Sequence, residues 1–189
     1  MQLVNPYTCD CQALVVAYEL RRRGIDICAR PAIMYELTDE KFYRGFAMMM
    51  HMPNLIWRNP VTQTAPDIFP LESVDMLDRV CGPDERYHLL FDTPFSSHII
   101  DVERYKGEVY AYDPAGGFNA PAREFFSRKL SPTLIYRNLM SNLRYYRVDD
   151  CEIFDRLAEQ MVIVPQNIPN LHAMFHSPII YHPNYDEED

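Results

Sequence analysis

Hydrophobic and polar positions follow two different periods along this chain of 189 residues. Between residues 11 and 23 the apolar side chains recur at the spacing of an α-helix, with Leu14 and Ala17 on the same stripe. Gly24 follows at the position where a helix commonly ends. The pattern therefore predicts a helix that begins at Cys11 and stops at Gly24.

The period changes to two in the middle of the chain, which is typical of half-buried strands. We expect strands at Arg86 to Asp92, His98 to Arg104 and Glu108 to Tyr112. The dipeptide Lys106-Gly107 fits a tight turn between the second and third of these strands. Short loops of this kind join antiparallel neighbours, so the pattern predicts an antiparallel sheet.

The other expected elements are shorter or less regular. They are a strand at 25–30 and helices at 38–50, 71–81, 122–130, 132–146 and 151–164. The expected order of elements is a leading helix, then helices and loops, and then a sheet. This order is typical of an α+β protein. We expect a first domain over residues 1–130 and a helical C-terminal extension over 131–189, which ends in an acidic tail and packs on the same domain.

The predicted hairpin carries a histidine and an aspartate on an otherwise apolar face. With a two-residue turn at 106–107, His98 and Asp113 point to the same side of the sheet and are diagonal neighbours about 7–8 Å apart at Cα. They share this face with four aliphatic residues: Ile100, Val102, Val109 and Ala111. The opposite face, which we expect to be solvated, carries Asp101, Glu103, Glu108, Tyr110 and Tyr112.

Cys11 stands where the first helix begins. The free backbone N–H groups and the positive dipole end of a helix stabilise a thiolate there, and the same N–H groups can bind the oxyanion of an attacked carbonyl. A cysteine nucleophile also needs a base and a group that orients the base, which His98 and Asp113 could supply. The other interpretation of these residues is a small buried cysteine and a core histidine without chemistry.

Composition narrows the function further. The net charge of −9 would repel a phosphate backbone, so we expect no nucleic-acid partner. Five cysteines make an odd number, which argues against a complete disulfide framework, and none is spaced like paired zinc ligands. We expect no metal ion and no other cofactor. No apolar run is long enough for a membrane span, and the first residues do not form a secretory signal.

The segment that opens the first helix resembles the papain-fold toxin domains of bacterial polymorphic toxin systems, which are predicted glutamine deamidases. The residues that carry this resemblance are Cys11-Gln12 and the stretch Ala17-Tyr18-Glu19-Leu20-Arg21-Arg22-Arg23-Gly24. A second, shorter match comprises Glu85-Arg86-Tyr87, Ser97-His98, Val102-Glu103, Gly107 and Asp113-Pro114. The likeness extends over roughly residues 5 to 120 and has the order Cys, His, Asp.

The resemblance implies a papain-like fold in which the N-terminal helix packs on the antiparallel sheet. It implies Cys11 as nucleophile, His98 as base and Asp113 as the orienting acid, with Gln12 in oxyanion support or substrate contact. Cys9 is the rival nucleophile. The sequence departs from the family in having Asp10 for Asn, Leu14 for a second cysteine and Ala115 for Gln, and these departures bear on substrate choice and activity.

The expected function is a cysteine-dependent amidohydrolase that deamidates glutamine in a target protein, as a bacterial toxin or effector. The same triad would serve a cysteine protease or an amide transferase, and a non-catalytic papain-like binding module in a phage or secretion particle is a further alternative. The expected partners are a protein substrate and an immunity protein, a carrier or a second copy. Such a protein would be made in the bacterial cytoplasm, delivered without a signal and active in a target-cell cytosol.

Overall fold

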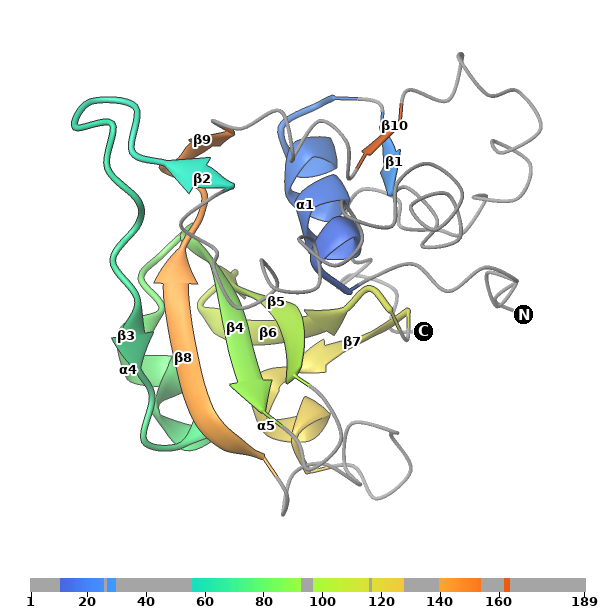
Figure 1. Ribbon diagram of the computed structural model, residues 1–189. Helices are drawn as coiled ribbons and strands as arrows, with labels where there is room; N and C mark the ends of the chain where they lie inside the picture. Colours follow the sequence, from blue (N-terminus) through green and yellow to red (C-terminus); the bar gives the residue numbers. More distant parts are fainter. Residues whose placement is uncertain are drawn as a thin grey trace.

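The computed structural model describes residues 11–25, 27–29, 56–92, 97–115, 117–127, 140–153 and 162–163. Its centre is a six-stranded antiparallel sheet with the long helix α1, Cys11–Arg22, lying across one face (Figure 1). Two two-stranded ladders stand beside this assembly. The chain is therefore an α+β protein, as the sequence pattern predicts.

The strand order in the large sheet is β3-β8-β4-β5-β6-β7. The bounds of its strands are β3 Phe69–Pro70, β4 Arg86–Asp92, β5 Ser97–Tyr105, β6 Glu108–Asp113, β7 Phe118–Pro121 and β8 Ser141–Arg147. The small ladders pair β1 (Cys28–Ala29) with β10 (Val162–Ile163), and β2 (Trp57–Arg58) with β9 (Glu152–Ile153). All of these pairs are antiparallel.

The predicted hairpin is confirmed in its strands, turn and register. Tyr105 pairs with Glu108, and the two turn residues between them have positive φ angles, 48° at Lys106 and 89° at Gly107. Two positive φ angles define a type I′ turn, whose twist matches that of the flanking strands. Because this turn sets the register, it also decides which side chains of β5 and β6 share a face.

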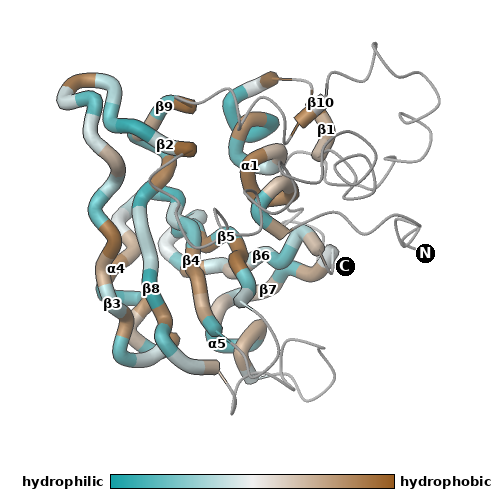
Figure 2. The backbone as a smooth tube through the Cα atoms, viewed as in Figure 1, coloured by the Kyte–Doolittle hydropathy of each residue, from teal (hydrophilic) through white to brown (hydrophobic). Residues whose placement is uncertain are grey.

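The two faces of the sheet bury separate hydrophobic cores, and the run of hydrophobic residues in the middle of β4 contributes to both of them in turn (Figure 2). Helix α1 covers one face and packs on residues such as Leu90 and Ile99. The other face carries Leu89 and Ile100 and is covered by short helices. These are η2 (Val74–Met76), α4 (Leu77–Val80) and α5 (Ala122–Phe125). In the middle of β5, from Ile99 to Glu103, side chains thus face α1 or the short helices according to their parity, whereas His98 near the start of the strand reaches Cys11 of α1.

Helix α1 begins at Cys11 and ends in the way that Gly24 predicts. Gly24 has a φ of 81°; its N–H donates to the Arg21 carbonyl, and the Ile25 N–H donates to the Leu20 carbonyl. This pair of bonds is a Schellman motif, which only a residue tolerant of positive φ completes without strain. Every residue from 12 to 20 is buried, so the helix is enclosed on all sides instead of having a solvated face.

The predicted helix over 132–146 is wrong where the structure describes it, because Ser141–Arg147 forms β8. This strand lies between β3 and β4, in the interior of the large sheet. The tyrosine pair at 145 and 146 fits strand propensity as well as helical spacing, and the open edge of β4 decides between them. Part of the predicted C-terminal extension therefore belongs to the same sheet as the first domain.

The predicted helix over 151–164 is also wrong at both of its ends, which form β9 and β10. The helix predicted from Ala122 does begin there, as α5. The predicted helix over 71–81 is present in part as η2 and α4, and that over 38–50 lies outside the described residues. None of the described helices has the length and apolar character needed to cross a membrane.

The face of the hairpin that we expected to be solvated lies against α1. Asp101, Glu103 and Tyr112 are buried there, whereas Glu108 is exposed. Arg22 of α1 forms an ion pair with Glu103 at 2.8 Å, and the ring of Tyr18 packs on that of Tyr112. The expectation failed because charged residues at a buried interface look the same in sequence as charged residues in water.

Candidate active site

Cys11 is the first residue of α1, and its side chain is only partly buried. The N–H groups of a helix's first turn have no acceptor inside the helix, and they point toward whatever lies beyond its N-terminus. A sulfur at this position is close to those donors and to the positive end of the dipole. Local sequence therefore accounts for a thiol in an electropositive position.

His98 and Asp113 meet across the adjacent strands β5 and β6. The Nε2 atom of His98 lies 3.0 Å from Oδ2 of Asp113, and the other carboxylate oxygen of Asp113 accepts the Ala115 N–H at 3.0 Å. The His98 ring also packs at a steep angle on Phe91, with 5.5 Å between centroids. The imidazole is therefore held by a carboxylate that is itself held, and by an aromatic neighbour on β4.

The Cys11 side chain reaches the same imidazole. Burial alone would lower the pKa of His98, but hydrogen bonds to Asp113 and Cys11 and the charges of both groups raise it from 6.5 to about 10. The imidazole is therefore protonated at neutral pH and stands between a carboxylate and a sulfur. The structure thus brings together the three side chains that the sequence nominates, while their catalytic roles stay a prediction.

Gln12, the fourth nominated residue, points into the core. Its side chain is fully buried, on the side of the helix that packs into the same core as Tyr146 of β8. In this position the amide cannot touch a substrate that approaches from solvent. A part in oxyanion binding remains a prediction for the backbone N–H of Gln12. The rival nucleophile Cys9 and the neighbouring Asp10 lie outside the described residues.

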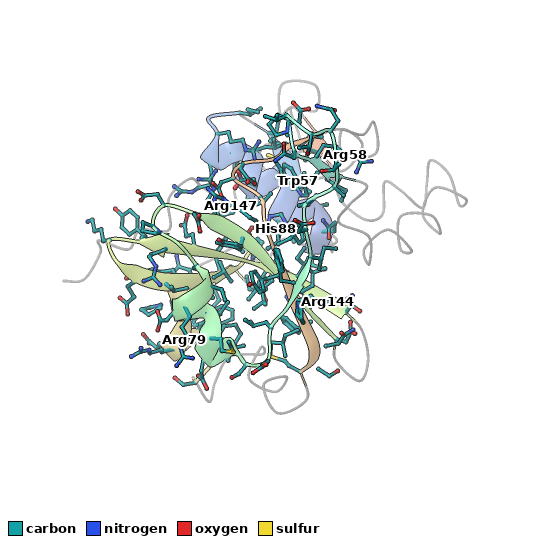
Figure 3. All side chains as sticks on the ribbon, turned by 90° about the vertical axis from the view of Figure 1, so that its left-hand side faces the viewer. Trp57, Arg58, Arg79, His88, Arg144 and Arg147 are labelled. Atoms are coloured by element: carbon teal, nitrogen blue, oxygen red, sulfur yellow. The ribbon has the colours of Figure 1, made fainter. Side chains whose placement is uncertain are left out.

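Sequence reasoning missed a group of buried polar side chains behind this site. His88 of β4 is fully buried; its Nδ1 lies 2.6 Å from the Tyr146 hydroxyl and its Nε2 lies 3.2 Å from Asp101. Figure 3 shows His88 next to Trp57, whose ring packs on it with 5.8 Å between centroids. The alternation along β4 could have signalled a buried His88, but its partner Tyr146 stood in a predicted helix.

No protein-family model matches the sequence, and comparison with curated proteins gives no significant match. The chemistry of the site therefore rests on its own geometry. Among the described residues, no cluster of three or more His, Cys, Asp or Glu side chains is arranged to hold a metal ion.

A cavity of about 490 Å³ lies elsewhere, between the short helices and the β5–β6 turn. Its floor is apolar, with Leu77 and Phe126, and its rim carries Asp75, Asp78 and Arg123. No cysteine, serine, threonine or histidine is among the residues that line it. We place the candidate active site at Cys11 because reactive groups, rather than the size of a hollow, decide what chemistry is possible.

Of the four described cysteines, only Cys11 is both partly exposed and in contact with a cation. Burial raises the pKa of Cys81 and of Cys151 to about 12, and Cys28 is buried. Because the thiolate is the reactive form, iodoacetamide at pH 7 should label Cys11 well before these three. Fragment mass spectra would assign each label and would also separate Cys11 from Cys9. Labelling of Cys81 or Cys151 first would contradict this expectation.

Proposed function

We propose that this protein is a papain-like cysteine amidohydrolase that deamidates glutamine side chains of a target protein. The observation that carries the proposal is the contact of His98 with both Cys11 and Asp113, at the start of a helix. A thiol, an imidazole and a carboxylate in this order are the parts of a cysteine-type acyl-transfer site. The glutamine substrate is supported only by the resemblance of the α1 segment to the toxin deamidases.

The first half-reaction uses the charge already present at the site. The Cys11 thiolate attacks the amide carbon, a C–S bond forms, and the oxyanion is bound by backbone N–H groups at the start of α1. Collapse of this intermediate breaks the C–N bond, and the His98 imidazolium gives its proton to the departing ammonia. The product is a thioester between Cys11 and the glutamine side chain.

The second half-reaction restores the site. His98, now neutral, takes a proton from a water molecule that attacks the thioester carbon. The C–S bond breaks, leaving a glutamic acid side chain on the substrate, the Cys11 thiolate and the His98 imidazolium. Asp113 holds the imidazole through Nε2, so we infer that Nδ1 faces the sulfur in both halves.

A reducing cytosol suits this reaction, because oxidation of the Cys11 thiol would inactivate the nucleophile. We propose delivery into a target-cell cytosol as a toxin or effector, with an immunity protein or a carrier as partner in the producing cell. In that setting the substrate is a protein of the target cell.

Expression of the chain in the cytosol of a test bacterium, with Cys11→Ala as matched control, tests the function. We expect glutamine-to-glutamate conversion in one or a few proteins, detected by peptide mass spectrometry, and none with Cys11→Ala. New peptide termini would indicate a protease, and new isopeptide or amine adducts would indicate a transferase. A growth effect that Cys11→Ala leaves intact would rule out the enzyme and favour a binding module.

A further inference from the structure

The cavity of about 490 Å³ between the short helices and the β5–β6 turn shares no residue with the candidate active site. Its floor is made of apolar side chains from three elements: Leu77 of α4, Val109 of β6 and Phe126, which follows α5. All three are buried in the core under the short helices. Ligand pockets typically enclose roughly 300–1,000 Å³ and are lined mainly by apolar side chains. The cavity therefore has the size and the floor of a binding site.

Charged side chains stand on the rim of this cavity, and the acids outnumber the bases. Asp75 of η2, Asp78 of α4 and Glu108 of β6 line it together with one cation, Arg123 of α5. The guanidinium of Arg123 binds the Asp78 carboxylate at 2.9 Å, so these two charges balance. Within the described part of the chain, Asp75 and Glu108 form no ion pair and accept bonds only from hydroxyl groups. The rim therefore keeps two uncompensated negative charges.

The two uncompensated carboxylates belong to different walls of the cavity. Asp75 comes from η2 on the helical side, and Glu108 comes from the first residue of β6 on the side of the turn. Lys106 in that turn does not line the cavity, and its ammonium lies over the ring of Tyr105 at 5.2 Å. An apolar group that enters the cavity therefore meets a carboxylate from each of two walls.

Two arginines hold these walls in place. Arg104 of β5 donates to the Cys81 carbonyl at the end of α4, at 2.8 Å, and to the Gly107 carbonyl of the turn, at 2.7 Å. Arg123 joins α5 to α4 through its bonds to the Asp78 carboxylate. A site whose walls are already fixed loses little conformational freedom when a ligand binds. The cavity is thus formed before any ligand enters it.

We propose that this cavity is a docking site for a partner protein, which inserts one large apolar side chain and places a lysine or an arginine on either side of it. Apolar side chains that fill pockets supply much of the binding energy at protein interfaces. The flanking cations would meet Asp75 and Glu108, and the net charge of −9 attracts a basic partner from a distance. This inference goes beyond the proposed function and does not depend on it, because no residue of the candidate active site takes part.

Titration of the full chain with a blocked tripeptide of arginine, phenylalanine and lysine tests the proposal. The methyl NMR signals of Leu77 and Val109 should shift and saturate, whereas those of Leu14 and Val15, in the core under α1, should not. A tripeptide with glutamate at both ends, and one with alanine in place of phenylalanine, should each bind at least about fivefold more weakly. Unshifted Leu77 and Val109 signals, or equal binding of the three peptides, would overturn the proposal.

The double variant Asp75→Asn, Glu108→Gln removes both uncompensated charges and keeps the apolar floor. We expect it to bind the cationic tripeptide about fivefold more weakly, since each exposed ion pair contributes modestly. Asp67→Asn with Glu72→Gln is the matched control, because it removes the same charge from two exposed carboxylates outside the cavity. Its affinity should stay within about twofold of the wild-type value.

Three outcomes of this comparison would contradict the docking site. An equal loss in the two double variants would mean general attraction of a cation to an acidic protein. Unchanged binding by Asp75→Asn, Glu108→Gln would mean that the cavity takes apolar groups without regard to charge. Signals of Leu77 and Val109 that change with protein concentration in the absence of peptide would mean that a second copy of the chain covers the cavity.

Discussion

His98→Ala should lower the rate at which iodoacetamide alkylates Cys11 by about 100-fold at pH 6.5. The reason is the loss of a cation beside the sulfur: hydrogen bonds and charge from Asp113 and Cys11 raise the pKa of His98 to about 10 although burial opposes this. A protonated imidazole beside the sulfur favours the thiolate. Without it, an ordinary thiol with a pKa of about 8.5 is only about 1% ionised at pH 6.5.

The pH profile separates this effect from a structural one. Because His98 stays protonated over this interval, the wild-type rate should exceed that of His98→Ala throughout pH 6 to 8. In His98→Ala the rate should rise about tenfold per pH unit, as the fraction of thiolate does. Ser97→Ala is the matched control, since Ser97 is the neighbour of His98 on β5 and its hydroxyl donates to Asp92. Equal and pH-dependent alkylation in the wild type and in His98→Ala would remove the ion pair from the mechanism.

The parts of this site that the sequence could predict are those set by local chemistry. The turn at Lys106-Gly107 fixes the register of β5 against β6, and the register puts His98 and Asp113 on one face. The start of α1 at Cys11 and its end at Gly24 follow from spacing and capping. These features depend only on residues that are close together in the chain, so they can be predicted from a single sequence.

The parts that the sequence could not predict depend on distant partners. β8 becomes a strand because β4 offers it an open edge, although Tyr145 and Tyr146 also fit a helical spacing. Glu103 is buried because α1 brings an arginine and a tyrosine to it, and Asp101 is buried on the same face. The buried polar group of His88, Tyr146 and Asp101 combines both failures, since Tyr146 lies on the strand that was missed and Asp101 on the face expected to be solvated.

Helix α1 carries the candidate nucleophile, so whatever fixes the helix on the sheet also fixes the site. Glu19 is its strongest described tie: the carboxylate is 1% exposed and accepts bonds from Arg23 at 2.7 Å and from Arg86 at 2.6 and 2.8 Å. The bonds from Arg86 come from β4 and are bidentate, a geometry that gives strong, directional binding. The hydrogen bond to Glu19 also raises the pKa of Arg86.

Glu19→Ala should therefore lower the free energy of unfolding by about 3 kcal/mol, measured by urea denaturation. Removal of one partner from a buried ion pair typically costs about 3–5 kcal/mol, and the low end applies here because Arg23 and Arg86 retain some solvent contact. The matched control is Glu108→Ala, an exposed glutamate of β6 whose loss should change stability by no more than about 0.5 kcal/mol. If both variants unfold at the same urea concentration, the Glu19 ion pairs do not hold α1. Alignment of Cys11 with His98 must then depend on the apolar packing of the helix.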